Sequence, residues 1–571
     1  MTTSSIDPTT LAVVRGYLDE VVDEMDLVQV RAAFSPIVSD MKDRANGIFH
    51  AATGETVAQG HLGSPIFITT MQHAVQAVVA WLTATQQAWE PGDAYLLNDP
   101  YLGGTHLQDA KLVAPFFWDG EPLLLLANTG HWMDTGAAQP GAFSPACRTI
   151  FEEGLRLPVI RLVRAGVMEP EVLELIRVNN RLPDLQEGDL RSQHNALLIG
   201  QRRLTRLFER YGAQVVQDCL AEFDSRSQQQ MESKIRAIPD GTYRASDVFD
   251  NDGITNRPIP VEVAITVDAA HMTIDFTGTA PMSEGPMNLT RPTTVTACYT
   301  ALKHLFPDIP INAGCFRPVS VQVPEGSLLA PIAPQAVGGY SEIAARLVGL
   351  VIEALGQSQP EMAAGRCFET GGVVVVSGDL GEEVWVLTFP YGGGYGASLG
   401  SNGLVNGTSV IGMANFPSLE IMEQDYPVHW NRFGINPDSG GAGEWAGGCG
   451  NEYDFTVETD ATLSILGDQS ISPPRGVLGG GPGGPNEVAY TVAGEWIAPE
   501  MGSKVPLRQM RAGDRVRLHS PGGGGYGDSA RREREAIQRD VQHGYLTAET
   551  ALERYELPDR LSPAPNDEVS A

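Results

Sequence analysis

Residues 98–134 read NDPYLGGTHLQDAKLVAPFFWDGEPLLLLANTGHWMD, and this stretch decides the fold around the candidate site. Two apolar runs lie within it, at about residues 110–117 and 122–128. Between them stands Asp119-Gly120, a dipeptide typical of the tight turn in a β-hairpin. The stretch is therefore predicted to fold back on itself as one antiparallel hairpin.

The hairpin carries two copies of His-x-x-Asp, His106/Asp109 and His131/Asp134, near its open end. With the turn centred on Asp119-Gly120, the numbers of paired residues sum to about 239, which places Asp109 opposite residue 130. Strict alternation would put His106 and Asp109 on opposite faces of a strand. We therefore expect His106 to curl in from the glycine-containing loop before the strand, because glycine makes such a curl easy.

Two imidazoles and one carboxylate suit Mn, Zn, Fe or Co and leave positions open for water or substrate. We predict that His106, Asp109 and His131 bind a divalent metal. The alternative is that His131 is a hydrogen-bonded core histidine and that the aspartates cap turns. Asp134 either contributes to the metal site or caps the Thr135-Gly136 turn.

Composition narrows the class of protein. The chain has 571 residues, 42% hydrophobic and 19% charged, which predicts several domains with large cores. Its net charge of −31 disfavours nucleic acid and anionic membranes as partners. Six cysteines without a C-x-x-C pair indicate reduced thiols. With neither a signal-peptide pattern nor a run long enough to span a bilayer, we expect a cytoplasmic protein.

The predicted fold class is α+β and multidomain, with an N-terminal mixed α/β metal-binding part followed by β-rich, glycine-rich modules. The apolar spacing predicts a core-facing helix over residues 8–34. We expect four domains. Residues 1–240 would form an N-terminal α+β domain with the metal-site hairpin, and residues 241–365 a central β-rich domain with helices. Residues 366–525 would form a glycine-rich β domain, and residues 526–571 a short helical tail.

Four glycine clusters, at residues 391–396, 439–450, 476–485 and 521–528, raise the question of phosphate binding. None ends in Gly-Lys-Ser/Thr, and none has the strand and helix context of a dinucleotide-binding loop. We predict that they serve tight turns and close backbone packing, and that this chain binds no ATP by itself.

Six separated motifs stand out along the chain. They are the residue 98–134 stretch, NNRLPDLQEGDLRSQ (179–193), DFTGTAP (275–281), PDIPINAGCFRPVSVQVPEGSLL (307–329), DSGGAG (438–443) and PGGGGYGD (521–528). Together, and in this order, they resemble the hydantoinase B family. This family includes the B-type chains of ATP-dependent N-methylhydantoinases, the corresponding half of 5-oxoprolinase, caprolactamase-type lactamases, and the alpha chains of acetone and acetophenone carboxylases.

The resemblance implies a heteromeric enzyme. A separate hydantoinase A-type ATPase subunit would bind ATP and Mg and phosphorylate an amide or carbonyl oxygen, and the B-type subunit would complete the reaction. The family's metal ligands fall on His106, Asp109 and His131. Asp43, in SDMKDRANGIF, matches an aspartate of relatives and is a candidate fourth ligand, a group that positions water or substrate, or a solvated turn carboxylate. Phe67 stands where many relatives have histidine, which implies a more apolar pocket.

The expected function is the metal-dependent B-type subunit of an ATP-dependent hydrolase of cyclic amides or imides such as hydantoin, oxoproline or a lactam. Asp43 and Asp134 would orient or deprotonate water, and Asp99, with Asn98, would shape the ligand loop or support a metal ligand. The alternative is the alpha subunit of an ATP-dependent ketone carboxylase. A third possibility is a non-catalytic scaffold for the A-type subunit. Arg317 is either an anion contact or a structural arginine paired with a carboxylate.

Overall fold

The structure is a computed structural model that describes residues 6–381 and 383–555. The chain divides into two compact units that are discontinuous in sequence. Unit 1 comprises Met1–Thr242, Ala264–Tyr340 and Ile411–Asn415, and unit 2 comprises Tyr243–Val263, Ser341–Val410 and Phe416–Ala571. The four consecutive domains expected from the sequence remain a prediction. Parts of the first and last of these, residues 1–5 and 556–571, lie outside the described residues.

The predicted N-terminal helix is present as α1 (Pro8–Ala32). The Asp7 side chain caps it by accepting a hydrogen bond from the Thr10 backbone N–H, and Pro8 occupies the first turn, where a missing N–H costs nothing. The predicted apolar stripe is buried in the unit 1 core, and it consists of Leu11, Val14, Leu18, Val21 and Val22.

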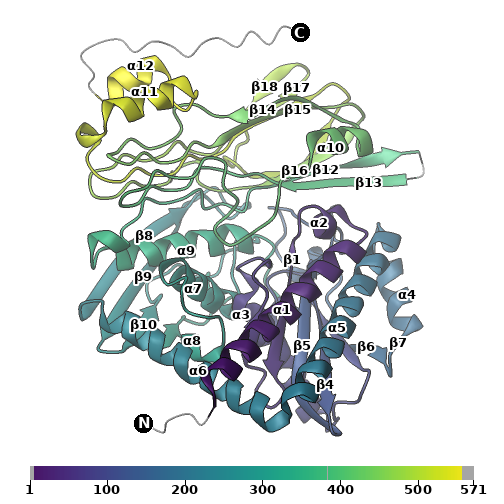
Figure 1. Cartoon of the computed structure of the whole chain (residues 1–571). Coiled ribbons are helices and arrows are strands. Elements are labelled where there is room, and N and C mark those ends of the chain that lie inside the picture. The colour runs from purple at the N-terminus through teal and green to yellow at the C-terminus, as the bar shows by residue number, and fades with distance from the viewer. Residues whose placement is uncertain (1–5, 382, 556–571) are drawn as a thin grey trace. The chain divides into compact units, whose positions relative to one another are not determined.

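Unit 1 is built on a seven-stranded antiparallel sheet in the order β2-β1-β5-β4-β3-β6-β7. Its strands are β1 (Arg44–His50), β2 (Thr56–Gln59), β3 (Ala94–Leu97), β4 (Asp109–Trp118), β5 (Glu121–His131), β6 (Ile160–Arg164) and β7 (Val167–Met168). Figure 1 shows α1 and α5 (Pro183–Tyr211) side by side in front of β4 and β5. The apolar face of the sheet, including Leu112 and Leu126, is buried in the same core as these helices. Helix α3 (Phe67–Ala84) also packs against β4 and β5, and its Phe67 ring lies beneath Lys111 of β4.

The predicted hairpin is formed by β4 and β5, and its register differs from the prediction by one residue at the open end. Trp118 pairs with Glu121 and Phe117 pairs with Pro122, as expected for the Asp119-Gly120 turn. A bulge between Phe116 and Phe117 then shifts the ladder. As a result, Asp109 pairs directly with His131 rather than with residue 130. This shift favours contact between Asp109 and His131, because directly opposed side chains lie on the same face of the sheet.

Unit 1 contains further helices, besides α3, which follows the short β1–β2 hairpin. They are α4 (Pro170–Val178), α5, α6 (Ala213–Arg236) and α7 (Arg291–Leu305), together with the short α2 (Pro36–Ser39) and α8 (Ala313–Phe316). Strand β10 (His271–Asp275) pairs antiparallel with β9 (Ile259–Asp268) and parallel with β11 (Val319–Gln322). The chain passes between the units within β8 (Gly241–Phe249), within β9 and before the second residue of α9 (Tyr340–Gly356). It also returns to unit 1 for the short segment Ile411–Asn415.

Unit 2 contains two antiparallel sheets, in the orders β13-β12-β16-β19 and β14-β15-β20-β17-β18. Aromatic side chains, including Phe389, Trp430 and Phe455, fill its core. The strands are β12 (Val373–Leu380), β13 (Glu383–Pro390), β14 (Val428–Ile435), β15 (Asn451–Val457), β16 (Ala461–Leu466), β17 (Glu487–Val492), β18 (Glu495–Ile497), β19 (Val505–Met510) and β20 (Arg515–His519). Its other helices are α10 (Leu419–Asp425), α11 (Arg534–Gln542) and α12 (Ala548–Arg554).

The glycine clusters of unit 2 pack backbone against backbone, as predicted. Gly523 donates its N–H to the Gly448 carbonyl at 2.9 Å, and its own carbonyl accepts from Gly441 at 2.8 Å. A Cβ on Gly523 would lie 1.9 Å from the Tyr395 carbonyl oxygen, and one on Gly447 would lie 1.9 Å from that of Gly523. Glycine is required at these positions because no larger residue allows the neighbouring chains to approach.

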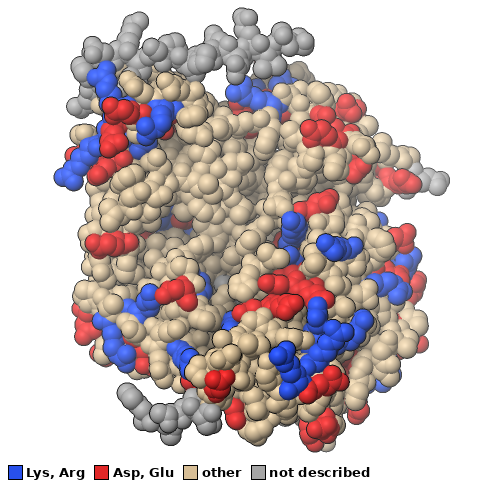
Figure 2. Space-filling model, viewed as in Figure 1, with Lys and Arg blue, Asp and Glu red and all other residues tan. Residues whose placement is uncertain are grey.

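On the face drawn in Figure 2, Asp and Glu side chains lie interspersed with Lys and Arg. In the part of the chain that the structure describes, no helix combines the length and the apolar character that crossing a membrane requires.

Candidate metal centre

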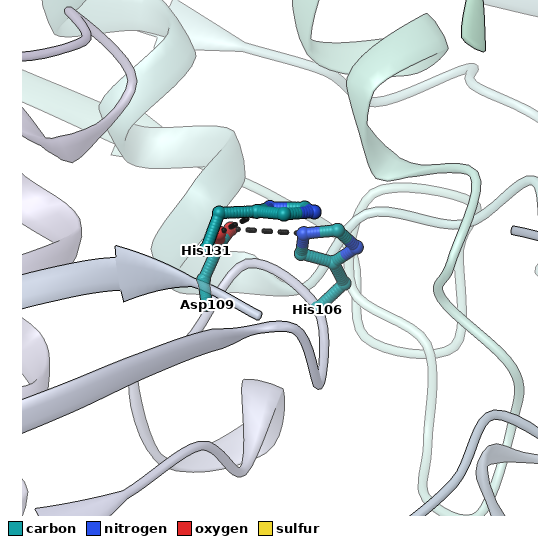
Figure 3. Close-up of side chains that lie close together, drawn as sticks. All are labelled: His106, Asp109 and His131. Carbon is teal, nitrogen blue, oxygen red and sulfur yellow. Dashed lines mark hydrogen bonds and ion pairs between the residues drawn. The ribbon is translucent and has the colours of Figure 1, made fainter. Parts of the chain in front are cut away.

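The three predicted metal ligands lie together at the open end of the β4–β5 hairpin (Figure 3). One Asp109 carboxylate oxygen is 3.1 Å from Nε2 of His106, and the other is 3.1 Å from Nδ1 of His131. One potential ligand atom from each residue lies within 4.8 Å of the other two. All three side chains are buried, with exposed fractions of 1%, 0% and 6% for His106, Asp109 and His131.

The loop before β4 places His106, as the sequence predicted. A 3-10 turn, η1 (Pro100–Leu102), ends at Gly103 with a φ of 118°. A Cβ on Gly103 would lie 2.5 Å from the backbone of α3, so the loop can lie against that helix only with glycine here. The Asn98 side chain holds the loop by donating to the Leu107 carbonyl and accepting from the Leu157 N–H. This is the loop-shaping contact expected of Asn98.

Burial and mutual contact set the protonation of the cluster. Burial lowers the pKa of His106, which favours the neutral imidazole. Burial opposes ionisation of Asp109, but the two histidines outweigh it and hold the pKa of Asp109 well below its usual range. Burial likewise opposes protonation of His131, but its hydrogen bond to Asp109, and then the charges of Asp109 and Asp43, raise the pKa of His131.

The donor set fits a divalent metal. Among the described residues, Nδ1 of His106 is a buried nitrogen without a hydrogen-bond partner. A buried polar atom of this kind costs free energy unless something binds it. A neutral imidazole, an ionised carboxylate and a second imidazole are the ligands that Zn, Mn, Fe or Co accept, with coordination positions left for water or substrate. The triad could therefore hold one metal ion, whose identity these residues do not specify.

Asp43 lies beside the cluster. One of its carboxylate oxygens is 3.7 Å from Nδ1 of His131, and the other accepts a hydrogen bond from the Ser64 hydroxyl at 3.1 Å. Burial raises the pKa of Asp43, and the charge of His131 opposes that shift. The side chain is 25% exposed, whereas Asp109 is fully buried. Asp43 is thus close to a ligand and reachable by water.

Asp134 and Asp99 do not join the cluster in the described structure. Asp134 forms an ion pair with Arg181 at 2.9 Å and accepts backbone N–H groups, among them that of Gly136. These contacts are those of the turn cap considered from the sequence. Asp99 forms an ion pair with Arg156 at 2.7 Å and caps η1. A catalytic role for either residue remains a prediction.

Three aromatic or basic neighbours were not identified from the sequence. The Tyr340 hydroxyl is 3.4 Å from Asp109, and its ring centroid is 4.6 Å from that of His106. Phe143 stacks on His131 at 5.8 Å. Lys111 is buried, donates to the Asp109 carbonyl at 3.0 Å, and has its pKa lowered to about 8 by burial. Only Lys111 could have been found from local sequence, because residues two apart on a strand, such as Asp109 and Lys111 of β4, lie on the same face.

A buried glutamate supports the segment that carries Tyr340. Glu153 accepts hydrogen bonds from the backbone N–H groups of Val337 at 2.9 Å and Gly338 at 2.6 Å. Burial raises the pKa of Glu153 to about 8, and these two donors oppose the shift. A Cβ on Gly338 would lie 2.9 Å from the carboxylate, so glycine allows this contact.

Comparisons with known proteins show similarity along nearly the whole chain. The B component of a putative D-/L-hydantoinase from Pseudomonas sp. is 28% identical over 569 residues, covering 96% of this chain and 95% of that protein. The crystal structure of the ATP-dependent caprolactamase from Pseudomonas jessenii superposes with a TM-score of 0.89 at 27% identity, covering 96% of both chains. Nucleotide-free acetone carboxylase superposes with a TM-score of 0.90 over 97% of this chain and 80% of that one. At 19% identity, this last likeness concerns the fold alone.

The motifs resembling hydantoinase B are therefore part of a match that extends along the chain. The hydantoinase B/oxoprolinase family matches residues 7–529, from the cap of α1 to the first residue after the last glycine cluster. The chain belongs to the hydantoinase B/oxoprolinase family.

Proposed function

We propose that this chain is the metal-dependent B-type subunit of an ATP-dependent hydrolase that opens a cyclic amide or imide. The observation that carries the proposal is the buried cluster of His106, Asp109 and His131. Family membership supports it, since relatives are named as the B component of a hydantoinase and the beta component of a caprolactamase. These names also support a hetero-oligomer in which a hydantoinase A-type ATPase is the partner.

The chemistry explains why two subunits would share the work. A lactam or hydantoin carbonyl resists attack because amide resonance must be lost. Phosphorylation of the carbonyl oxygen by the ATP-binding partner would remove that resonance. The activated carbon then needs a water nucleophile, held in place and relieved of a proton. A divalent metal, when bound, supplies Lewis acidity and lowers the pKa of water that it holds.

This chain's own residues would supply the remaining functions. His106, Asp109 and His131 would hold the metal, and Thr105 and Tyr340 fix the Asp109 carboxylate by hydrogen bonds. Asp43 would orient water and accept its proton, because it stands beside His131 and is partly exposed.

The two remaining predicted aspartates would act at a distance. Asp134 and Asp99 would position the segments that follow β5 and β3, through Arg181 and Arg156. Neither carboxylate would then need to contact the substrate.

The test is an assay of the complex reconstituted from this chain and its A-type ATPase partner. ADP release would be measured with hydantoin, 5-oxoproline, lactams and aryl ketones, each with and without bicarbonate. Ring opening coupled to ADP release without bicarbonate is expected, and the complex carrying His106→Ala should lose it. Turnover only with a ketone and bicarbonate would assign the chain to the ketone carboxylases instead. Undiminished ring opening with His106→Ala would favour the scaffold alternative.

A further inference from the structure

A pocket lies in unit 1 at the far end of the central strands from the metal centre. It has a volume of about 450 Å³ and is lined by the β1–β2 turn, the start of β5, and helices α5 and α6. Strand β1 runs from Arg44, which pairs with Gly130 beside the metal ligand His131, to His50, which pairs with Leu124 at the pocket. At 3.3 Å per residue, the two ends of β1 lie roughly 20 Å apart. The pocket is thus separate from the metal centre.

The lining of this pocket combines apolar and ionisable side chains. Leu123, Phe208 and Leu220 are among its apolar residues. His50, Glu55 and Asp224 supply the ionisable groups, and neither lysine nor arginine is among the described residues that line the pocket. The arrangement is amphipathic, which is the usual character of small-molecule sites.

Neighbouring side chains hold the two carboxylates of the pocket in place. Asp224 has a side chain only 11% exposed, and Nε2 of His50 lies 3.8 Å from it. Arg317 contacts Asp224 at 3.0 Å and Glu55 at 3.5 Å, which confirms the structural pairing considered for it from the sequence. One guanidinium therefore serves two carboxylates, leaving about one negative charge in excess. Burial raises the pKa of Asp224 and lowers the pKa of His50, so a further cationic donor would stabilise the carboxylate.

We propose that this pocket binds a small amphipathic organic cation, with its ammonium group against Asp224 and Glu55 and its apolar body against Leu123, Phe208 and Leu220. His50 in its neutral form would accept one of the ammonium hydrogens. The site lies beyond the proposed hydrolase reaction and does not depend on it, because none of these residues belongs to the metal cluster.

Isothermal titration calorimetry of the full chain with hexylammonium tests the proposal. Saturable binding is expected, with at least tenfold weaker binding of 1-hexanol and hexanoate, which lack the positive charge. Asp224→Asn should weaken hexylammonium binding at least tenfold, whereas Asp218→Asn, on the exposed face of the same helix, should not. His106→Ala should leave binding unchanged, which separates this pocket from the metal centre.

A second variant keeps the test decisive if Asp224→Asn does not fold. Ala221 lines the pocket and is exposed, so Ala221→Trp should fill the space without disturbing the core and abolish binding. Absence of saturable binding, equal binding of hexanoate, or indifference to both variants would overturn the proposal. Tighter binding of Nα-acetyl-lysine amide than of hexylammonium would also overturn it, in favour of a lysine side chain from a protein partner.

Discussion

The β4–β5 hairpin of unit 1 depends on the side chains of its residues, whereas the glycine clusters of unit 2 depend on the absence of side chains. In the hairpin, a bulge brings Asp109 opposite His131, and the side chains then make the site. In the clusters, carbonyl oxygens such as those of Tyr395 and Gly523 occupy the space that a Cβ would need. Both regions are rich in motifs that resemble the family, but the hairpin motif specifies chemistry, whereas the glycine motifs specify close packing.

Because of this difference, the hairpin and the glycine clusters should respond differently to mutation. A ligand can be replaced without collapse if its neighbours still pack, so its loss is expected to affect binding and rate. A packed glycine offers no such freedom, because its neighbours are backbone atoms that cannot rotate away. Mutations at the two regions should therefore separate loss of function from loss of fold.

The largest effect is expected for Gly523→Ala. Its Cβ would lie 1.9 Å from the Tyr395 carbonyl, so unit 2 should lose its folded structure or be destabilised by more than about 4 kcal/mol. Circular dichroism and thermal unfolding would measure this. The matched control is Gly434→Ala in β14, where nothing lies within 4 Å of the new Cβ. Equal stability of the two variants would contradict the packing role of the glycine clusters.

Asp43→Asn should next reduce turnover of the reconstituted complex by about 10²–10⁴-fold, because the amide cannot accept a proton from water. The bound metal should remain, since the three ligands are intact. Steady-state rates and metal analysis would be compared with the exposed neighbour variant Asp40→Asn, which should behave as wild type. An unchanged rate would remove Asp43 from the mechanism, and loss of metal would make it a fourth ligand.

Glu153→Gln should change how stability depends on pH. The folded chain binds the Glu153 proton more tightly than the unfolded chain, since its pKa rises from 4.5 to about 8. The stability that this tighter proton binding gives the folded chain is complete below about pH 4.5. It is lost as the pH rises from there through 8, at about 1.4 kcal/mol per pH unit. Glutamine cannot ionise, so the variant's unfolding midpoint should fall less between pH 5 and 9. Parallel curves for wild type, Glu153→Gln and the exposed control Glu174→Gln would refute this.

Asp134→Asn is expected to have the smallest effect, a loss of about 1–3 kcal/mol in stability. It leaves Arg181 without its charge partner but keeps an acceptor for the turn. Metal content and the rate per folded complex should stay near wild type. Asp184→Asn, whose exposed ion pair with Arg177 lies on the surface, should cost less than about 0.5 kcal/mol. A collapse of the rate with stability intact would instead restore the catalytic role predicted for Asp134.

Much of unit 1 could be predicted from local sequence. The Asp7-Pro8 cap, the apolar stripe of α1 and the Asp119-Gly120 turn are short-range signals, and they led to the correct helix and hairpin. The same hairpin brought His106, Asp109 and His131 together. The bulge at Phe116 and Phe117 was missed, because it depends on strand packing rather than on a turn residue.

The rest of the site depends on contacts between residues distant in the chain. Tyr340 reaches Asp109 from the start of α9, and Arg181 reaches Asp134 from the segment before α5. No periodicity or turn signal links such pairs, so their partners became visible only in the folded chain. The discontinuous boundaries of the two units have the same origin, since they follow contacts rather than composition.

The most direct test of the central claim is the metal content of the purified chain, measured by inductively coupled plasma mass spectrometry. We expect about one divalent transition metal per wild-type chain, less than about one tenth of that in folded His106→Ala and Asp109→Asn variants, and wild-type content in the exposed-histidine control His61→Ala. Metal-free wild-type protein that also fails to bind added Zn, Mn, Fe or Co, or variants that retain full metal content, would contradict the assignment of this cluster as a metal centre.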